Sequence, residues 1–171
     1  PVNFTVTVRD AEGHPVKDAA VTYKVDQEEG VTFTGSGDRS DKEGIVKGAI
    51  ASTRVGEKMM TVTIAGSENT ISLAPEKVTF VPGAPEALKF VSQPTLTRAG
   101  IKISPAVTVE VLDHYGNRAT NGIFSAYVEL VRSSGGVVQN GGSAAHMIDA
   151  VQGLITFDNL IINKPQTGYA L

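Results

Sequence analysis

The sequence has 171 residues, of which 41% are hydrophobic, 19% charged and 6% aromatic. It contains no cysteine, which excludes disulfides, thiolate metal sites and a thiol nucleophile within these residues. A net charge of −3 gives no electrostatic basis for nucleic-acid binding, so no nucleic-acid partner is predicted. No run approaches the roughly 20 apolar residues that a membrane-spanning helix needs, so no membrane insertion of this segment is predicted. Because the sequence starts and stops within strand-like segments, we expect it to be a fragment of a longer protein.

Alternating apolar and polar residues predict β-strands along most of the chain. In chain order, strands are expected at residues 2–8, 20–25, 60–64, 70–73, 77–80, 87–91, 107–111 and 124–131, the last with its clearest alternation at 127–131. Clusters of Gly, Pro, Asn and Asp separate these segments, and no window has a sustained 3.6-residue apolar period. Short strands with frequent turns predict an all-β fold of the sandwich or barrel type.

The chain contains an internal repeat. Residues 4–13 (FTVTVRDAEG) return without a gap as residues 107–116 (VTVEVLDHYG), 103 positions later. In both copies a strand ends in Asp-x-x-Gly, where the Asp side chain caps a turn and the Gly accepts a positive φ. A second match pairs residues 42–46 with residues 151–155, 109 positions later. A repeat of about a hundred residues is the size of one sandwich domain.

The boundary between the two copies is predicted at a proline-rich segment. We expect one β-sandwich at residues 1–82, a short Pro/Gly linker at 83–85 and a second sandwich at 86–171. The second copy has a leading strand at 87–91 that the first copy does not match. The first copy continues through the strands expected at 70–73 and 77–80, whereas the second copy stops at residue 171 before any counterpart of them. We therefore expect the first sandwich to lack its N-terminal strand and the second to lack its last strand.

Three motifs in the first copy resemble the bacterial Ig-like domains of group 1, the tandem modules of invasin- and intimin-type surface proteins. Residues 6–16 carry the strand followed by Asp-x-x-Gly-x-Pro-Val, and residues 40–46 carry Ser-Asp-x-x-Gly, with Ser where the family has Thr. Residues 56–62 resemble the Gly-containing turn that leads into the penultimate strand. The second copy is more divergent, because Arg118 and Ala119 stand where Pro-Val is usual.

This resemblance implies two tandem Ig-like β-sandwiches in an extracellular, cell-surface protein. It implies a non-catalytic spacer role in an adhesin-type stalk, with neighbouring Ig-like repeats of the same chain as partners. A host receptor or glycan would be bound by domains outside this segment. A second interpretation is an assembly module of a surface layer or a phage surface, since a sandwich without its last strand exposes an edge.

Candidate chemical groups are sparse, and no catalytic residue is predicted. The three histidines, His14, His114 and His146, have no partner at metal-ligand spacing, so they are expected in surface turns or strands. No Ser lies in a Gly-x-Ser-x-Gly elbow. No cofactor is predicted, with calcium held by Asp10, Glu12 and Asp41 as the alternative that the acidic turns leave open.

Glycan or receptor binding through loops is the leading alternative to a spacer. Its candidate ligand face consists of Tyr115, Asn117 and Asn140. Among the other tyrosines, Tyr23 and Tyr127 lie in alternating segments and are expected to be at least half-buried. Tyr169 is expected to be a core residue, by resemblance to other Ig-like sandwiches.

Overall fold

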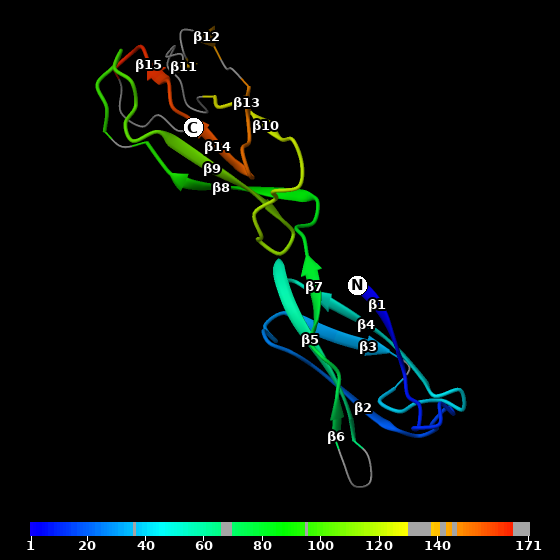
Figure 1. Ribbon diagram of the computed structural model, residues 1–171. Helices are drawn as coiled ribbons and strands as arrows, with labels where there is room; N and C mark the ends of the chain where they lie inside the picture. Colours follow the sequence, from blue (N-terminus) through cyan, green and yellow to red (C-terminus); the bar gives the residue numbers. More distant parts are fainter. Residues whose placement is uncertain are drawn as a thin grey trace. The chain divides into compact units, whose positions relative to one another are not determined.

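The computed structural model describes residues 1–35, 37–65, 70–94, 96–129, 138–140, 143–144 and 147–165 (Figure 1). The secondary structure assigned to these residues consists of antiparallel β-strands, which confirms the predicted all-β fold. The chain divides into two compact units, Pro1–Val81 and Pro82–Leu171. Within the described residues there is no helix of the length and apolarity needed to cross a membrane.

The described residues of the first unit form two sheets. One sheet has the order β1-β4-β3, formed by β1 (Val2–Thr7), β4 (Ile45–Ser52) and β3 (Val31–Gly35). In the other, β5 (Gly56–Ala65) pairs with β2 (Ala20–Val25), β6 (Thr70–Ser72) and β7 (Glu76–Phe80). Strand β2 has the bounds that the sequence predicts, whereas β3 is not predicted from the sequence.

The core of the first unit lies between these sheets. The buried set is Val6, Val8, Val21, Val25, Val46, Ile50, Met60 and Val62. At the edge of this core, the ring of Tyr23 lies 5.0 Å from that of Phe4 and 5.8 Å from that of Phe33, measured between centroids. The period-two pattern read from the sequence therefore identifies the buried face of the strands.

The described residues of the second unit form two three-stranded sheets and one two-stranded sheet. One has the order β14-β9-β8, with β8 (Pro85–Ser92), β9 (Val107–Asp113) and β14 (Leu154–Phe157). The other three-stranded sheet has the order β12-β11-β15, with β11 (Val138–Asn140), β12 (Ser143–Ala144) and β15 (Leu160–Ile162), and the two-stranded sheet pairs β10 (Ser125–Ala126) with β13 (Ile148–Asp149). The buried core of this unit is Ile103, Val107, Val109, Val111, Ala119, Ile155, Phe157 and Leu160.

Strand register confirms the internal repeat. Val6 pairs with Val46 across β1 and β4. Val109, 103 positions after Val6, pairs with Ile155, 109 positions after Val46. The two sequence matches, found separately, are thus the two sides of the same antiparallel ladder in each unit. Among the described strands, β1 pairs with β4, whereas β9 lies between β14 and β8.

Of the strand predicted at residues 124–131, the described residues of the structure contain only β10, Ser125–Ala126. Residues 127–129 lie outside any strand, and residues 130–131 are outside the described part of the chain. Tyr127 is 57% exposed, so the prediction that it is at least half-buried is wrong. The physical reason is its phase, because Phe124, Ala126 and Val128 pack against the core and Tyr127 falls between two of them. Tyr169 lies outside the described residues.

Candidate functional site

The Asp-x-x-Gly turn of the second unit is built around a buried carboxylate. Asp113, the last residue of β9, is only 4% exposed. Its Oδ1 accepts hydrogen bonds from the backbone N–H groups of Tyr115 and Asn117, both at 2.9 Å. Its Oδ2 accepts from Nδ2 of Asn117 and from the backbone N–H of Gly83, both at 3.0 Å. The carboxylate therefore closes its own turn and also binds the segment that leads into β8.

These hydrogen bonds determine the ionisation of Asp113. Burial raises the pKa of its carboxyl group, but the hydrogen bonds from the Asn117 side chain and from the N–H groups of Gly83, Asn117 and Tyr115 lower it further than burial raises it. The net pKa is below the ordinary value of 3.8. Donors that stabilise the charged form outweigh desolvation here.

The corresponding turn of the first unit uses the same geometry at the surface. Asp10, the counterpart of Asp113, accepts a hydrogen bond from the backbone N–H of His14 at 2.8 Å, and its Oδ2 lies 3.3 Å from Nδ1 of His14. The Asp10 side chain is 41% exposed. The backbone bond from Asp10 to His14, at 3.0 Å, matches that from Asp113 to Asn117, at 2.8 Å. The repeat therefore conserves the turn but not the burial of its carboxylate.

The Ser-Asp-x-x-Gly motif also satisfies backbone groups. Ser40 is 2% exposed, and its Oγ donates to the carbonyl of Val16 at 2.7 Å and accepts from the N–H of Ala19 at 3.0 Å. Oδ1 of Asp41 accepts from the N–H of Ile45 at 2.9 Å and also from that of Glu43. The hydroxyl at this position fastens two segments distant in sequence, which gives a structural reason for Ser or Thr there.

The motif glycines are required by both conformation and space. Gly44 has φ +75°, and a Cβ built on it would lie 2.4 Å from the carbonyl oxygen of Val8. Gly153, its counterpart, has φ +69°, and a Cβ there would lie 2.5 Å from the carbonyl oxygen of Ala119. At both positions the turn passes so close to a neighbouring backbone segment that no side chain fits.

The structure brings two of the three predicted ligand residues together. Tyr115 and Asn117 share the turn after β9, where Tyr115 is 57% exposed and its ring lies edge-on to that of His114, with 5.1 Å between centroids. Asn117 donates its side-chain amide to Asp113 and so supports the turn. Asn140 is the last residue of β11, and β11 lies at the other end of the second unit from this turn (Figure 1).

The residues proposed for calcium do not converge. Within the described part of the chain, no group of three or more His, Asp or Glu side chains is placed to hold a metal ion. Asp10 and Asp41 instead use their carboxylates inside their own turns. His114 contacts Glu86 through Nδ1 at 2.9 Å, and His146 lies outside the described residues.

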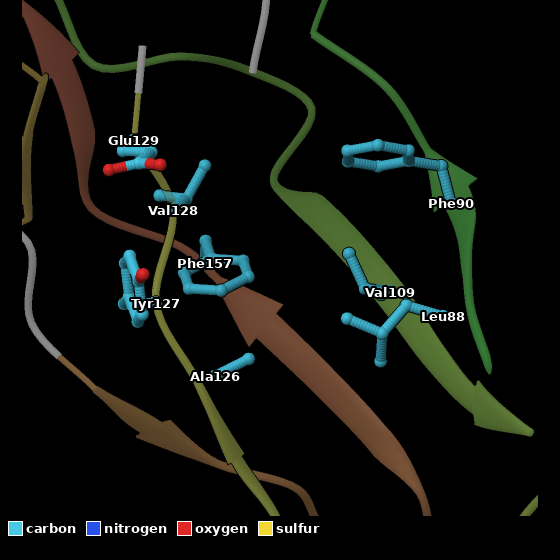
Figure 2. Close-up of a pocket in the computed structure, with 8 residues that line it drawn as sticks. All are labelled: Leu88, Phe90, Val109, Ala126, Tyr127, Val128, Glu129 and Phe157. Atoms are coloured by element: carbon cyan, nitrogen blue, oxygen red, sulfur yellow. The ribbon is translucent and has the colours of Figure 1, made fainter. Parts of the chain in front are cut away.

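The second unit has a groove that is not predicted from the sequence. It encloses about 280 Å³ between Leu88 and Phe90 of β8, Val109 of β9 and Phe157 of β14 on one side and residues 126–129 on the other. Figure 2 shows the apolar side chains directed toward the same space, with Glu129 at one end. The sequence signal at this place is the alternation of residues 127–131, which predicts a strand and gives no indication of a groove.

Comparison with known proteins relates the fold to a family. Residues 1–81 match the profile of the bacterial Ig-like domain (group 1). No curated protein is significantly similar in sequence to the chain.

Similar solved structures include InvD of Yersinia pseudotuberculosis and the S-layer protein SbsC. The InvD structure is 18% identical with a TM-score of 0.46, and the match covers 98% of this chain and 51% of the InvD chain. The structure of SbsC domains 5–6 is 16% identical with a TM-score of 0.37, covering 95% of this chain and 87% of that one. The chain thus spans about half the length of the InvD chain that it matches. The family profile, together with the turns and register described above, assigns the first unit, residues 1–81, to the bacterial Ig-like domains of group 1.

Proposed function

We propose that this chain is a non-catalytic spacer segment of an extracellular bacterial surface protein. Tandem Ig-like modules in such a segment hold other domains at a distance from the cell. The partners of each module are then its neighbouring modules in the same polypeptide. Domains outside this segment bind the host receptor or glycan.

The connection between the two units carries this proposal. Phe80, the last residue of β7, pairs with Gly56 in the first unit. In the second unit the carbonyl of Pro82 accepts from Nδ2 of Asn121 at 2.8 Å, and the N–H of Gly83 donates to Asp113. A single residue, Val81, therefore separates the last paired residue of one unit from residues fastened to the other. Pro82 further restricts rotation, because its ring fixes φ.

The predicted boundaries were 1–82 and 86–171; we propose instead that the first module ends at Val81 and the second begins at Pro82, with the bending point of the connection at Val81. The residues 83–85 that the sequence suggests as linker are held by the second module, since Gly83 is hydrogen-bonded to Asp113 and Pro85 begins β8. A short connection of restricted rotation suits a stalk better than a flexible tether does.

The motif side chains support a structural role as well. Asp10, Ser40, Asp41 and Asp113 direct their polar atoms at backbone groups of the same unit. A catalytic or ligand-binding side chain needs at least some of its hydrogen-bonding atoms directed at a substrate. These motifs therefore determine turns and strand pairing.

Small-angle scattering tests the spacer function. A spacer predicts that the radius of gyration of the protein stays constant between low and high salt. Insertion of a Gly-Ser-Gly-Ser segment after Val81 then changes the scattering curve, because the units become free to reorient. A curve that the insertion leaves unchanged would contradict the proposal, since the natural connection would already behave as a flexible tether.

A second candidate function is glycan or receptor binding through the turn after β9. It is favoured by the exposed ring of Tyr115 beside His114. A glycan array with the whole chain tests it. Binding that disappears in Tyr115→Ala but persists in Tyr127→Ala, an equally exposed tyrosine at 57%, supports this candidate. The absence of any array signal would contradict this second candidate and favour the spacer function.

A further inference from the structure

Two neighbouring residues before β10 form a chemically labile pair. Asn121 and Asn140 are the two asparagines of the sequence that a glycine follows. In such a pair the backbone nitrogen of the glycine can attack the side-chain amide carbon of the asparagine, because the glycine has no side chain to hinder the approach. Asn140 lies in β11, where it is paired with Ser143 and with Leu160. Asn121 and Gly122 are instead both exposed and lie outside any strand.

The reacting groups of this pair are accessible. Among the described residues, the N–H of Gly122 has no hydrogen-bond acceptor, so no sheet ladder holds its nitrogen in place. Ile123, the next residue, is 90% exposed, so water surrounds the segment. The nitrogen that attacks and the water that the reaction consumes are therefore both available at Asn121.

Packing requires the glycine of the pair. A Cβ built on Gly122 would lie 2.5 Å from Cζ of Phe124. The ring of Phe124 packs against the core of the second unit, so a side chain at position 122 would have to displace a core contact. The fold therefore retains a glycine after Asn121, and with it the labile pair.

The side-chain amide of Asn121 has a structural role. Its Nδ2 donates to the carbonyl of Pro82 at 2.8 Å. The next residue, Gly83, donates its N–H to Asp113. Two side chains thus fasten the segment that leads into β8. One exposed hydrogen bond slows the loss of the amide by about fivefold or less and does not prevent it.

We propose that Asn121 is a site of spontaneous deamidation that releases Pro82. The nitrogen of Gly122 forms a bond to Cγ of Asn121, the bond from Cγ to Nδ2 breaks, and Nδ2 leaves as ammonia with the proton from Gly122. Water then opens the resulting cyclic imide. Opening at Cγ gives aspartate, and opening at the backbone carbonyl carbon gives isoaspartate, which lengthens the backbone by one methylene group.

Both products lose the donor to Pro82. Each places a carboxylate, which only accepts hydrogen bonds, beside the carbonyl oxygen of Pro82. Of the two side chains that fasten the segment, Asp113 then remains. The reaction does not depend on the spacer function, whereas its consequence for a stalk, a connection that loosens as the protein ages, rests on that function.

The test follows the whole chain during incubation in mildly alkaline buffer. Peptide mapping by mass spectrometry should show conversion of Asn121 to isoaspartate and aspartate, whereas Asn3, which Phe4 follows, should stay unchanged. Asn121→Gln keeps a side-chain amide but separates it from the attacking nitrogen by one more rotatable bond, so it should react at least about tenfold more slowly. Position 121 is exposed, so this variant is expected to fold.

Hydrogen exchange at Gly83 measures the release of the segment. Its N–H is bonded to Asp113 and exchanges when the segment opens. In Asn121→Asp, which has the side chain of one product, this N–H should exchange about three- to tenfold faster than in the native protein. In the aged native protein the fast-exchanging fraction should equal the deamidated fraction. Aged Asn121→Gln should keep its initial exchange rate.

Two results would overturn the proposal. Conversion of Asn121 that is absent, or no faster than that of Asn3, would show that the fold protects the pair. Conversion with unchanged exchange at Gly83 would show that the amide of Asn121 does not fasten the segment. Neither result bears on the spacer function, which the scattering experiment tests separately.

Discussion

Asp113 accepts a hydrogen bond from the backbone N–H of Gly83 at 3.0 Å, so the turn that ends β9 also holds the segment that leads into β8. Its counterpart Asp10 closes the same turn at the surface of the first unit. One sequence motif thus has two structural roles. In the second unit it determines the turn and anchors the connection, and in the first it determines the turn alone.

Replacement of this carboxylate should have unequal effects in the two units. Asp113→Ala removes the acceptor of the hydrogen bonds from Gly83, Tyr115 and Asn117 and should lower the free energy of unfolding of the second unit by about 3 kcal/mol. Asp10→Ala, at an exposed position, should cost the first unit about 1 kcal/mol or less. Amide hydrogen exchange in β9 and in β1 reports the two units separately. Equal losses in both units would contradict the different roles of the two residues.

The low pKa of Asp113 makes the second unit sensitive to acid. Because its pKa is lower in the folded than in the unfolded state, the charged form stabilises the folded state at pH values above the ordinary 3.8. This contribution is lost as the pH falls below 3.8 toward the pKa of the folded state. The free energy of unfolding, measured against pH, should therefore fall more steeply for the native protein than for Asp113→Asn. Parallel pH profiles would show that Asp113 does not titrate with unfolding.

The motif glycines should tolerate alanine differently according to the space around them. Gly13→Ala, at φ +87° with nothing within 4 Å of its Cβ, should cost about 1 kcal/mol of backbone strain. Gly44→Ala adds a 2.4 Å approach to the carbonyl of Val8 and should cost about 3 kcal/mol or more. Chemical denaturation of the two variants gives the difference. A Gly44→Ala variant as stable as Gly13→Ala would show that the turn moves away from Val8 without cost.

Ser40 should act through its hydroxyl group. Ser40→Ala removes the bonds to the carbonyl of Val16 and the N–H of Ala19, and should lower the stability of the first unit by about 1–3 kcal/mol. Ser40→Thr keeps the hydroxyl and should recover most of this loss. Thermal unfolding of both variants measures the effect. A Thr variant no better than Ala would indicate that the size of the side chain is what matters.

Tyr23 should be replaceable by phenylalanine without loss of stability. Its hydroxyl is buried without a hydrogen-bond partner among the described residues, and burial, with Asp38 as the smaller cause, raises its pKa. Phenylalanine keeps the ring contacts with Phe4 and Phe33. The free energy of unfolding of Tyr23→Phe should be equal to that of the native protein or higher by up to about 1 kcal/mol. A loss above that size would mean that the hydroxyl is satisfied.

The sequence predicts local features well because alternation and turn residues act locally. The strand at 20–25, the paired copies at 4–13 and 107–116, and the turn glycines all lie where the sequence places them. The burial of Asp113 could not be predicted, because it depends on Gly83, which is 30 residues away. The groove was missed for a similar reason. A period-two pattern predicts a strand at 127–131, but only the strands beside it decide whether the strand forms.

The most direct test of the spacer function measures the distance distribution between the two units. The chain has no cysteine, so Lys24→Cys and Lys89→Cys, at exposed positions of β2 and β8, accept one spin label each. A stiff connection predicts one narrow distribution by pulsed electron resonance, as narrow as that of a control pair at Thr5 and Lys24 within the first unit. A broad distribution, equal to that obtained after a Gly-Ser-Gly-Ser insertion behind Val81, would contradict the account.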